Sequence, residues 1–109
     1  MATTYKVLGQ SAPSATTATT LYTVPSSTQA VLSTIAVCNR GASSATYRIA
    51  IRPNGAALAN EHYIAYDSAI TANNSTMITI GVTLGDTDVI TVYASTADLS
   101  FNAFGSEIA

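Results

Sequence analysis

The sequence predicts an all-β protein, an antiparallel β-sandwich of about eight short strands. Apolar and polar residues alternate along most of the chain, which is the pattern of a half-buried strand. Turn signals built from Gly, Pro, Asn, Asp and Ser separate these segments at intervals of about 8 to 15 residues. We therefore expect one sandwich domain over residues 1–109, and a jelly-roll is one topology open to such strands.

The first two expected strands are short. They cover residues 5–8 and 21–24, and Pro25 ends the second because proline cannot donate to a β-ladder. Between them, residues 9–20 read GQSAPSATTATT, a run of small and polar side chains. This composition predicts a connection or an extended arm.

The third expected strand, residues 29–38, is long and rich in β-branched residues. Alternation gives one face Val31, Ser33, Ile35 and Val37, and the other face Leu32, Thr34, Ala36 and Cys38. Apolar side chains on both faces indicate a strand that is covered twice, by its own core and by a second surface.

The fourth expected strand, residues 47–52, carries half of the positive charge of the protein. Its inward-facing residues are Tyr47, Ile49 and Ile51. Arg48 and Arg52 face outward with Ala50 between them, and arginine is enriched among interface hot spots. We predict that both arginines bridge to a neighbouring subunit; a solvated strand face is the alternative.

The second half of the chain continues the same pattern. Pro53-Asn54-Gly55 predicts a turn, and residues 56–60 (AALAN) predict a single helical turn. The remaining expected strands are 62–66, 76–84, 89–94 and 99–104, with loops at 71–75 and 85–88.

Charge is scarce along the whole chain. Charged residues make up 9% of the sequence, against about a quarter in an average soluble domain, and the formal net charge is −2. Four dispersed cations form no basic stripe, so no nucleic-acid partner is expected. We expect much of the surface to be buried in a homo-oligomer, with a trimer as the first choice. The alternative is an ordinary domain with a Ser/Thr surface.

No segment of the sequence indicates a membrane or an exported protein. No apolar run reaches the roughly 18 residues of a transmembrane helix, and the N-terminus lacks the pattern of a signal peptide. The sequence therefore predicts a soluble protein that is made in a cytoplasm and has no membrane partner.

Cys38 is the only cysteine and the first candidate for chemistry. A nucleophilic cysteine needs a lowered pKa, usually from a histidine or a helix N-terminus. Here the cysteine ends a β-branched strand, and the only histidine, His62, is distant in sequence. We therefore interpret Cys38 as a small buried hydrophobe and residues 36–53 as strand, hairpin, strand, with Asn39 and Gly41 suited to positive φ.

The other candidates also favour structural roles. A metal site needs several ligands at short spacing, whereas Glu61 would lie on the opposite face of a strand from His62. Asp86 and Asp88 lack the Gly and the later Glu of a calcium loop, and aspartates in turns usually bond their own backbone. We predict no catalytic residue, no metal and no cofactor, and hence no enzyme.

Tyrosine is abundant, with six residues in a chain of 109. Tyr63 and Tyr66 lie near His62 in sequence, and tyrosine is common both at interfaces and in ordinary strands. The predicted interface residues are therefore Arg48, Arg52, His62, Tyr63 and Tyr66.

Several segments carry a family resemblance. These are TLYTVPSSTQAVLSTIAVCNRG, YRIAIRPNG, HYIAYD and LSFNAFGSEI. Together they resemble small virion proteins of tailed bacteriophages, notably phages that infect cyanobacteria and other aquatic bacteria. The resemblance extends from about Lys6 to Ile108 and supplies no catalytic residue.

The resemblance implies a β-sandwich structural protein of a virion, assembled in the host cytoplasm. Its expected partners are other copies and virion proteins such as the major capsid protein or tail proteins. We favour a capsid decoration or cement protein, because one small domain without a repeat suits a coat of many copies. A tail, baseplate or fibre component and a carbohydrate-binding module on the tail remain open alternatives.

Overall fold

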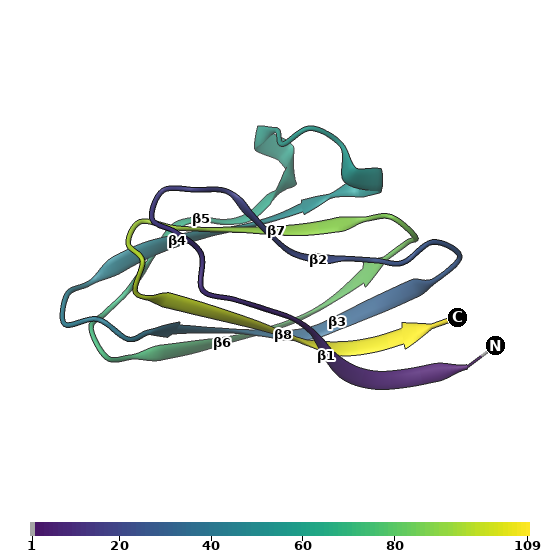
Figure 1. Cartoon of the computed structure of the whole chain (residues 1–109), viewed down its shortest axis with the longest axis horizontal. Coiled ribbons are helices and arrows are strands. Elements are labelled where there is room, and N and C mark those ends of the chain that lie inside the picture. Colours follow the sequence, from purple (N-terminus) through teal and green to yellow (C-terminus); the bar gives the residue numbers. More distant parts are fainter. Residues whose placement is uncertain (1) are drawn as a thin grey trace.

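The protein consists of two four-stranded antiparallel sheets packed face to face. The computed structural model describes residues 2–109 (Figure 1). Its strands are β1 (Thr3–Ser11), β2 (Thr19–Thr23), β3 (Gln29–Asn39), β4 (Ala45–Arg52), β5 (Tyr63–Ile70), β6 (Ser75–Leu84), β7 (Val89–Ala94) and β8 (Leu99–Ile108). The expected sandwich of eight strands is confirmed, and within residues 2–109 no helix is long and apolar enough to cross a membrane.

The order of the strands is that of a jelly-roll. One sheet has the order β1-β8-β3-β6, and the other has the order β2-β7-β4-β5. The pairs β1·β8, β2·β7, β3·β6 and β4·β5 arise when one long antiparallel ribbon is rolled into a double sheet. In this roll, β4 and β5 are the consecutive strands that pair directly.

The expected hairpin at residues 36–53 is therefore wrong. Strand β3 belongs to one sheet and β4 to the other, so the chain crosses the sandwich between them. Neither Asn39 nor Gly41 has a positive φ. Instead, the buried Asn39 side chain organises the corner: its amide donates to the carbonyls of Ser43 (2.8 Å) and Ile70 (3.2 Å), and its Oδ1 accepts from Gly41 N–H (2.9 Å).

The face assignment of β3 also needs correction. Its pairing with both β6 and β8 shifts between Leu32 and Thr34, which marks a β-bulge. The residues that face the core are Ala30, Leu32, Ile35, Val37 and Asn39, and those that face outward include Val31, Thr34, Ala36 and Cys38. The bulge brings Leu32 of one alternating set and Ile35 and Val37 of the other to the same side.

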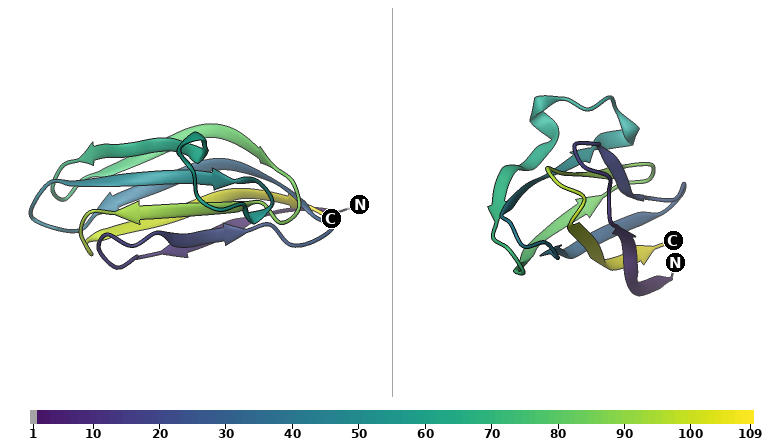
Figure 2. Two further views of the ribbon diagram at one scale, coloured as in Figure 1. Left: turned by 90° about the horizontal axis from the view of Figure 1, so that it is seen from above. Right: turned by 60° about the vertical axis from the view of Figure 1, so that its left-hand side comes forward.

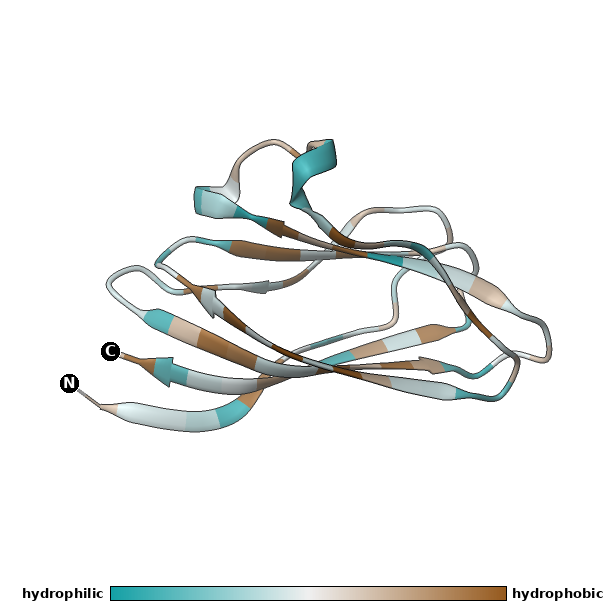
Figure 3. Ribbon diagram, turned by 180° about the vertical axis from the view of Figure 1, so that it is seen from behind, coloured by the Kyte–Doolittle hydropathy of each residue, from teal (hydrophilic) through white to brown (hydrophobic). Residues whose placement is uncertain are grey.

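The core lies between the sheets. Tyr47 of β4 and Phe101 of β8 meet across it edge to face, with ring centroids 6.3 Å apart. Aliphatic residues from both sheets surround this pair, among them Leu32, Ile49 and Val92. Figure 3 shows hydrophobic residues along the strands of both sheets, while the turns are mostly polar.

Two connections cover part of the outer face of β2-β7-β4-β5. Residues 53–62 leave the sheet between β4 and β5 and form two short 3₁₀ turns, Pro53–Gly55 and Asn60–His62 (Figures 1 and 2). The first confirms the predicted turn, with Asn54 and Gly55 at positive φ. The predicted helical turn at 56–60 is wrong, because residues 56–59 are not helical and the second turn begins only at Asn60.

The other connection joins β1 to β2. It occupies residues 12–18, a shorter range than the predicted 9–20, because β1 continues to Ser11 and β2 begins at Thr19. This connection is attached to the sandwich by Thr16, whose N–H donates to the carbonyl of Ala94 (2.8 Å).

Candidate binding surfaces

Arg48 is the centre of a cluster on the outer face of β2-β7-β4-β5, which we call the arginine face. Its guanidinium lies between the rings of Tyr66 and Tyr93, 4.2 Å from each ring centroid. Tyr93 of β7 stands directly opposite Arg48 of β4 in the sheet register. Stacking of this kind gives a cation–π attraction on both sides of the guanidinium.

Asp67 completes the cluster with a two-pronged ion pair. Its carboxylate accepts hydrogen bonds from Arg48 Nε (2.7 Å) and Nη2 (3.3 Å). Asp67 has a φ of 50° within β5, where the pairing with β4 is irregular. The hydrogen bond to Asp67 raises the pKa of Arg48 above its ordinary value.

Tyr63 extends the cluster to the 53–62 connection. Its ring meets that of Tyr66 edge to face, with centroids 4.9 Å apart, and Tyr66 is 57% exposed. The structure thus brings three of the predicted residues together: Arg48, Tyr63 and Tyr66. Nothing in the local sequence pattern distinguishes Tyr93, because only the register of β4 with β7 places it beside Arg48.

Arg52 binds the connection rather than the cluster. Its Nε donates to the carbonyl of Ala56 (2.7 Å), and Nη2 donates to the carbonyl of Gly55 (3.1 Å). His62 likewise serves the connection, since its Nδ1 accepts from Ala59 N–H (3.1 Å). Both predicted arginines therefore bind acceptors of their own chain, and their expected bridges to a second subunit remain a prediction.

A hollow of about 240 Å³ lies between the two connections on the arginine face. Buried Ala50 and Thr91 are among its lining residues, together with Leu58, Tyr63 and Tyr93. Arg48 also borders it, but the charge of Arg48 is already matched by Asp67. The hollow is consequently a mainly aromatic and apolar site with hydroxyl groups and no unmatched charge.

The outer face of β1-β8-β3-β6 differs in kind, because no strand position that points outward from it is charged. We call it the neutral face. Its outward residues include Tyr5, Val7 and Gln10 on β1, Ser100, Asn102, Phe104 and Ser106 on β8, Val31, Thr34, Ala36 and Cys38 on β3, and Ser75, Met77, Thr79 and Thr83 on β6. Large apolar side chains are well exposed here, with Tyr5 at 85% and Met77 at 64%.

Cross-strand rows order the neutral face. One row is Val7, Phe104, Thr34 and Thr79, and its neighbour is Tyr5, Ser106, Val31 and Thr83. Several of the polar side chains bond one another: Gln10 Nε2 donates to Asn102 Oδ1 (2.7 Å), and the hydroxyls of Thr34 and Thr79 are 3.3 Å apart. Arg40 reaches the far end of the face, where its Nε donates to Ser100 Oγ (2.8 Å).

Cys38 also lies on the neutral face, in a row between Ser75 and Ser100. It is half-buried and outside the core, so the expectation of a buried hydrophobe needs correction. The bulge in β3 explains the difference, because it directs Ile35 and Val37 inward and leaves Cys38 in the outward set. His62 belongs to the opposite sheet's connection and supplies no base here.

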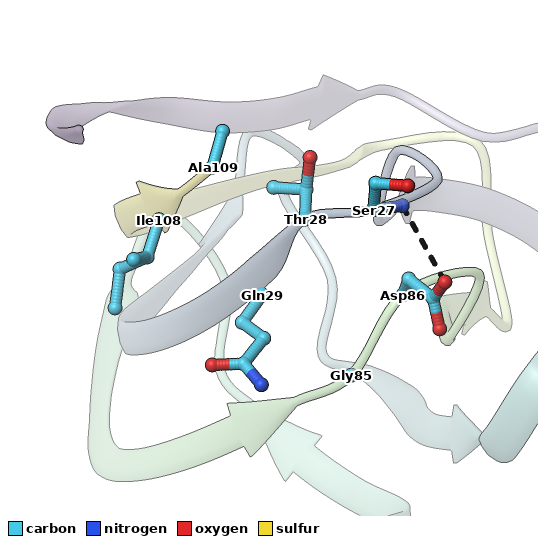
Figure 4. Close-up of a pocket in the computed structure, with 7 residues that line it drawn as sticks. All are labelled: Ser27, Thr28, Gln29, Gly85, Asp86, Ile108 and Ala109. Carbon is cyan, nitrogen blue, oxygen red and sulfur yellow. Dashed lines mark hydrogen bonds between the residues drawn. The ribbon is translucent and has the colours of Figure 1, made fainter. Parts of the chain in front are cut away.

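A larger pocket of about 440 Å³ opens at the end of the sandwich where both termini lie (Figure 4). Its polar contact is a hydrogen bond from Ser27 N–H to Asp86 (3.4 Å). In the same turn, the Asp88 carboxylate accepts from the N–H groups of Gly85 and Asn54 (2.8 Å each), which confirms the backbone role expected for a turn aspartate. Among residues 2–109, no cluster of three His, Cys, Asp or Glu side chains could hold a metal ion.

Comparison with known proteins adds no relative. No protein-family model, curated protein or solved structure matches the chain. The indications of function are therefore the surfaces described above and the sequence resemblance.

Proposed function

We propose that this chain is a non-enzymatic structural subunit of a tailed-phage virion, which associates with other copies and decorates or stabilises the capsid. The observation that carries the proposal is the neutral face, a four-stranded surface without an outward charge that exposes Tyr5, Val7, Met77 and Phe104. Large exposed apolar surfaces commonly mark interaction sites. The sequence resemblance to small virion proteins is the reason for assigning the subunit to a phage particle.

The location on the particle is part of the proposal. We favour the capsid over the tail, baseplate or fibre, because a single sandwich without a repeat suits a many-copy coat. Purified particles of the encoding phage should contain the chain, and mass spectrometry of separated heads and tails should find it with the heads. Recovery with the tails would move the proposal to the tail, and absence from particles would overturn it.

The hollow on the arginine face favours a second candidate function, a carbohydrate-binding module on the tail. Tyr63 and Tyr93 offer aromatic rings to the apolar face of a sugar, and Thr91 offers a hydroxyl. Because Asp67 neutralises Arg48, the hollow suits an uncharged sugar better than an anion.

The second candidate has a matched test. Titration with neutral monosaccharides and host surface polysaccharide should show binding that Tyr63→Ala abolishes and Tyr5→Ala, on the other face, leaves unchanged. Binding that is lost in neither variant, or no binding to any sugar, would remove this candidate.

A further inference from the structure

We infer that the neutral face is a self-association surface, on which two copies of this chain pack face to face about a two-fold axis. This inference rests on the proposed function and deepens it, because it names the surface through which the structural subunit associates with other copies of the chain.

The composition of the face resembles the centre of an interface. Phe104 lies in a central strand between Val7 and Thr34 in one cross-strand row. Depletion of charge at the centre, with aromatic residues and Met enriched, distinguishes interface cores from the remaining surface. Polar residues such as Ser100 and Ser75 occupy the end of the face, where a rim is expected.

Two pairs of polar side chains near the middle of this face already have partners within it. An unpaired polar group loses its water on burial, and this desolvation is unfavourable. Here Gln10 already bonds Asn102, and Thr34 already bonds Thr79, within the same face. These side chains would keep their hydrogen bonds beneath a partner.

The absence of charge fits a second copy as the partner. A two-fold interface places the same patch against itself, so a charge near the axis would meet its own equivalent, and a patch without charge avoids this repulsion. The neutral face meets this condition along all four strands, whereas the arginine face presents Arg48, Arg52 and Asp67. A complementary charged partner would find no opposite charge on these strands to bind.

The area is sufficient for a small stable interface. Four strands about 4.8 Å apart, with some 8 residues each at about 3.3 Å, give a face of roughly 500 Å². Two such faces bury about 1,000 Å², which is the lower bound for a specific interface. Sheets that stack face to face pack at about 10 Å.

A pair of threonine variants tests the inference. Thr34→Lys places a charge at the centre of the neutral face, while Thr20→Lys makes the same change at an exposed position on β2, in the other sheet. Sedimentation equilibrium up to millimolar concentration should show a dimer for the natural chain and for Thr20→Lys. Thr34→Lys should dissociate about 100-fold more readily, because like charges would meet across the axis.

The other outcomes are decisive as well. A natural chain that stays monomeric, or forms a trimer, overturns the inference, as does a dimer that Thr34→Lys leaves intact. If Thr34→Lys does not fold, Tyr5→Lys replaces it, because that side chain is 85% exposed and unimportant for the core. A monomer that is nevertheless found in particles would refute the self-association surface and leave the proposed virion role standing.

Discussion

The two outer faces of the sandwich differ in how their side chains are satisfied. On the arginine face, Arg48 has Asp67 and two tyrosine rings, and Arg52 has the carbonyls of the 53–62 connection. On the neutral face, polar groups pair locally and the apolar groups Tyr5 and Met77 have no cover in the single chain. The comparison teaches that outward arginines on a strand can be satisfied by groups of their own chain, whereas large exposed apolar side chains stay uncovered.

The largest expected effect is a difference in unfolding free energy when the same substitution, phenylalanine to alanine, is made in the core and on the neutral face. Phe101→Ala should lower the free energy of unfolding by about 3 to 5 kcal/mol, because a fully buried ring contact with Tyr47 is lost. Phe104→Ala removes the same group from the outer face, where it is 38% exposed, and should cost far less in the isolated subunit. Denaturant unfolding of both variants at low protein concentration checks the difference; equal losses would mean that Phe104 belongs to the core.

The second effect concerns how the arginine face holds its covering connection. Arg52→Ala removes the hydrogen bonds to Gly55 and Ala56 and should cost about 1 to 2 kcal/mol. Hydrogen exchange should become faster at residues 53–62 and stay unchanged in β1. Arg48→Ala is the control, since its partners lie on the sheet itself; similar exchange in the two variants would refute the assignment of Arg52 to the connection.

A third, smaller effect tests the ion pair of the arginine face. A double-mutant cycle with Arg48→Gln and Asp67→Asn should give a weak coupling that decreases with added salt, because Asp67 is substantially exposed. Asparagine is chosen because it tolerates the positive φ of Asp67. Thermal unfolding at low and high ionic strength supplies the measurement, and a coupling that is insensitive to salt would contradict the solvent-exposed geometry.

The smallest effect lies at the end where the two sheets meet. Glu107 of β8 accepts hydrogen bonds from the Tyr22 hydroxyl of β2 and from Lys6 of β1. The hydrogen bond from Tyr22, and to a smaller extent the contact with Lys6, lowers the pKa of Glu107. The pKa of Tyr22 is raised, first by burial and then by its contact with Glu107.

The sign of the acid dependence follows from this lowered pKa. Glu107 contributes stability that is complete above its unfolded-state pKa of about 4.3 and is lost as pH falls through the lower folded-state value. Glu107→Gln should therefore unfold with a weaker dependence on pH in the acid range than the natural chain. Thermal unfolding between neutral pH and strong acid measures this, and parallel pH profiles would show that Glu107 makes no such contribution.

The sequence predicted all eight strands, because the signals for a strand are local. Alternation and turn residues place Val89–Ala94 correctly, and Gln29–Asn39 to within one residue. Strand ends were less certain where pairing extends them: β8 continues past Phe104 to Ile108 because β1 and β3 supply partners there. The outward direction of Arg48 and Arg52 was also readable from the period of two residues.

Only the tertiary structure decided which strands pair and what each outward side chain contacts. The stack of Arg48 between Tyr66 and Tyr93 depends on the register of β4 with both neighbours, and this register is set by partners distant in sequence. The neutral face depends on the bulge after Leu32, which changes the face of every later residue of β3. A strand's period of two residues specifies its faces only while the ladder is regular, so one inserted residue, stabilised by neighbouring strands, reverses what the local pattern predicts.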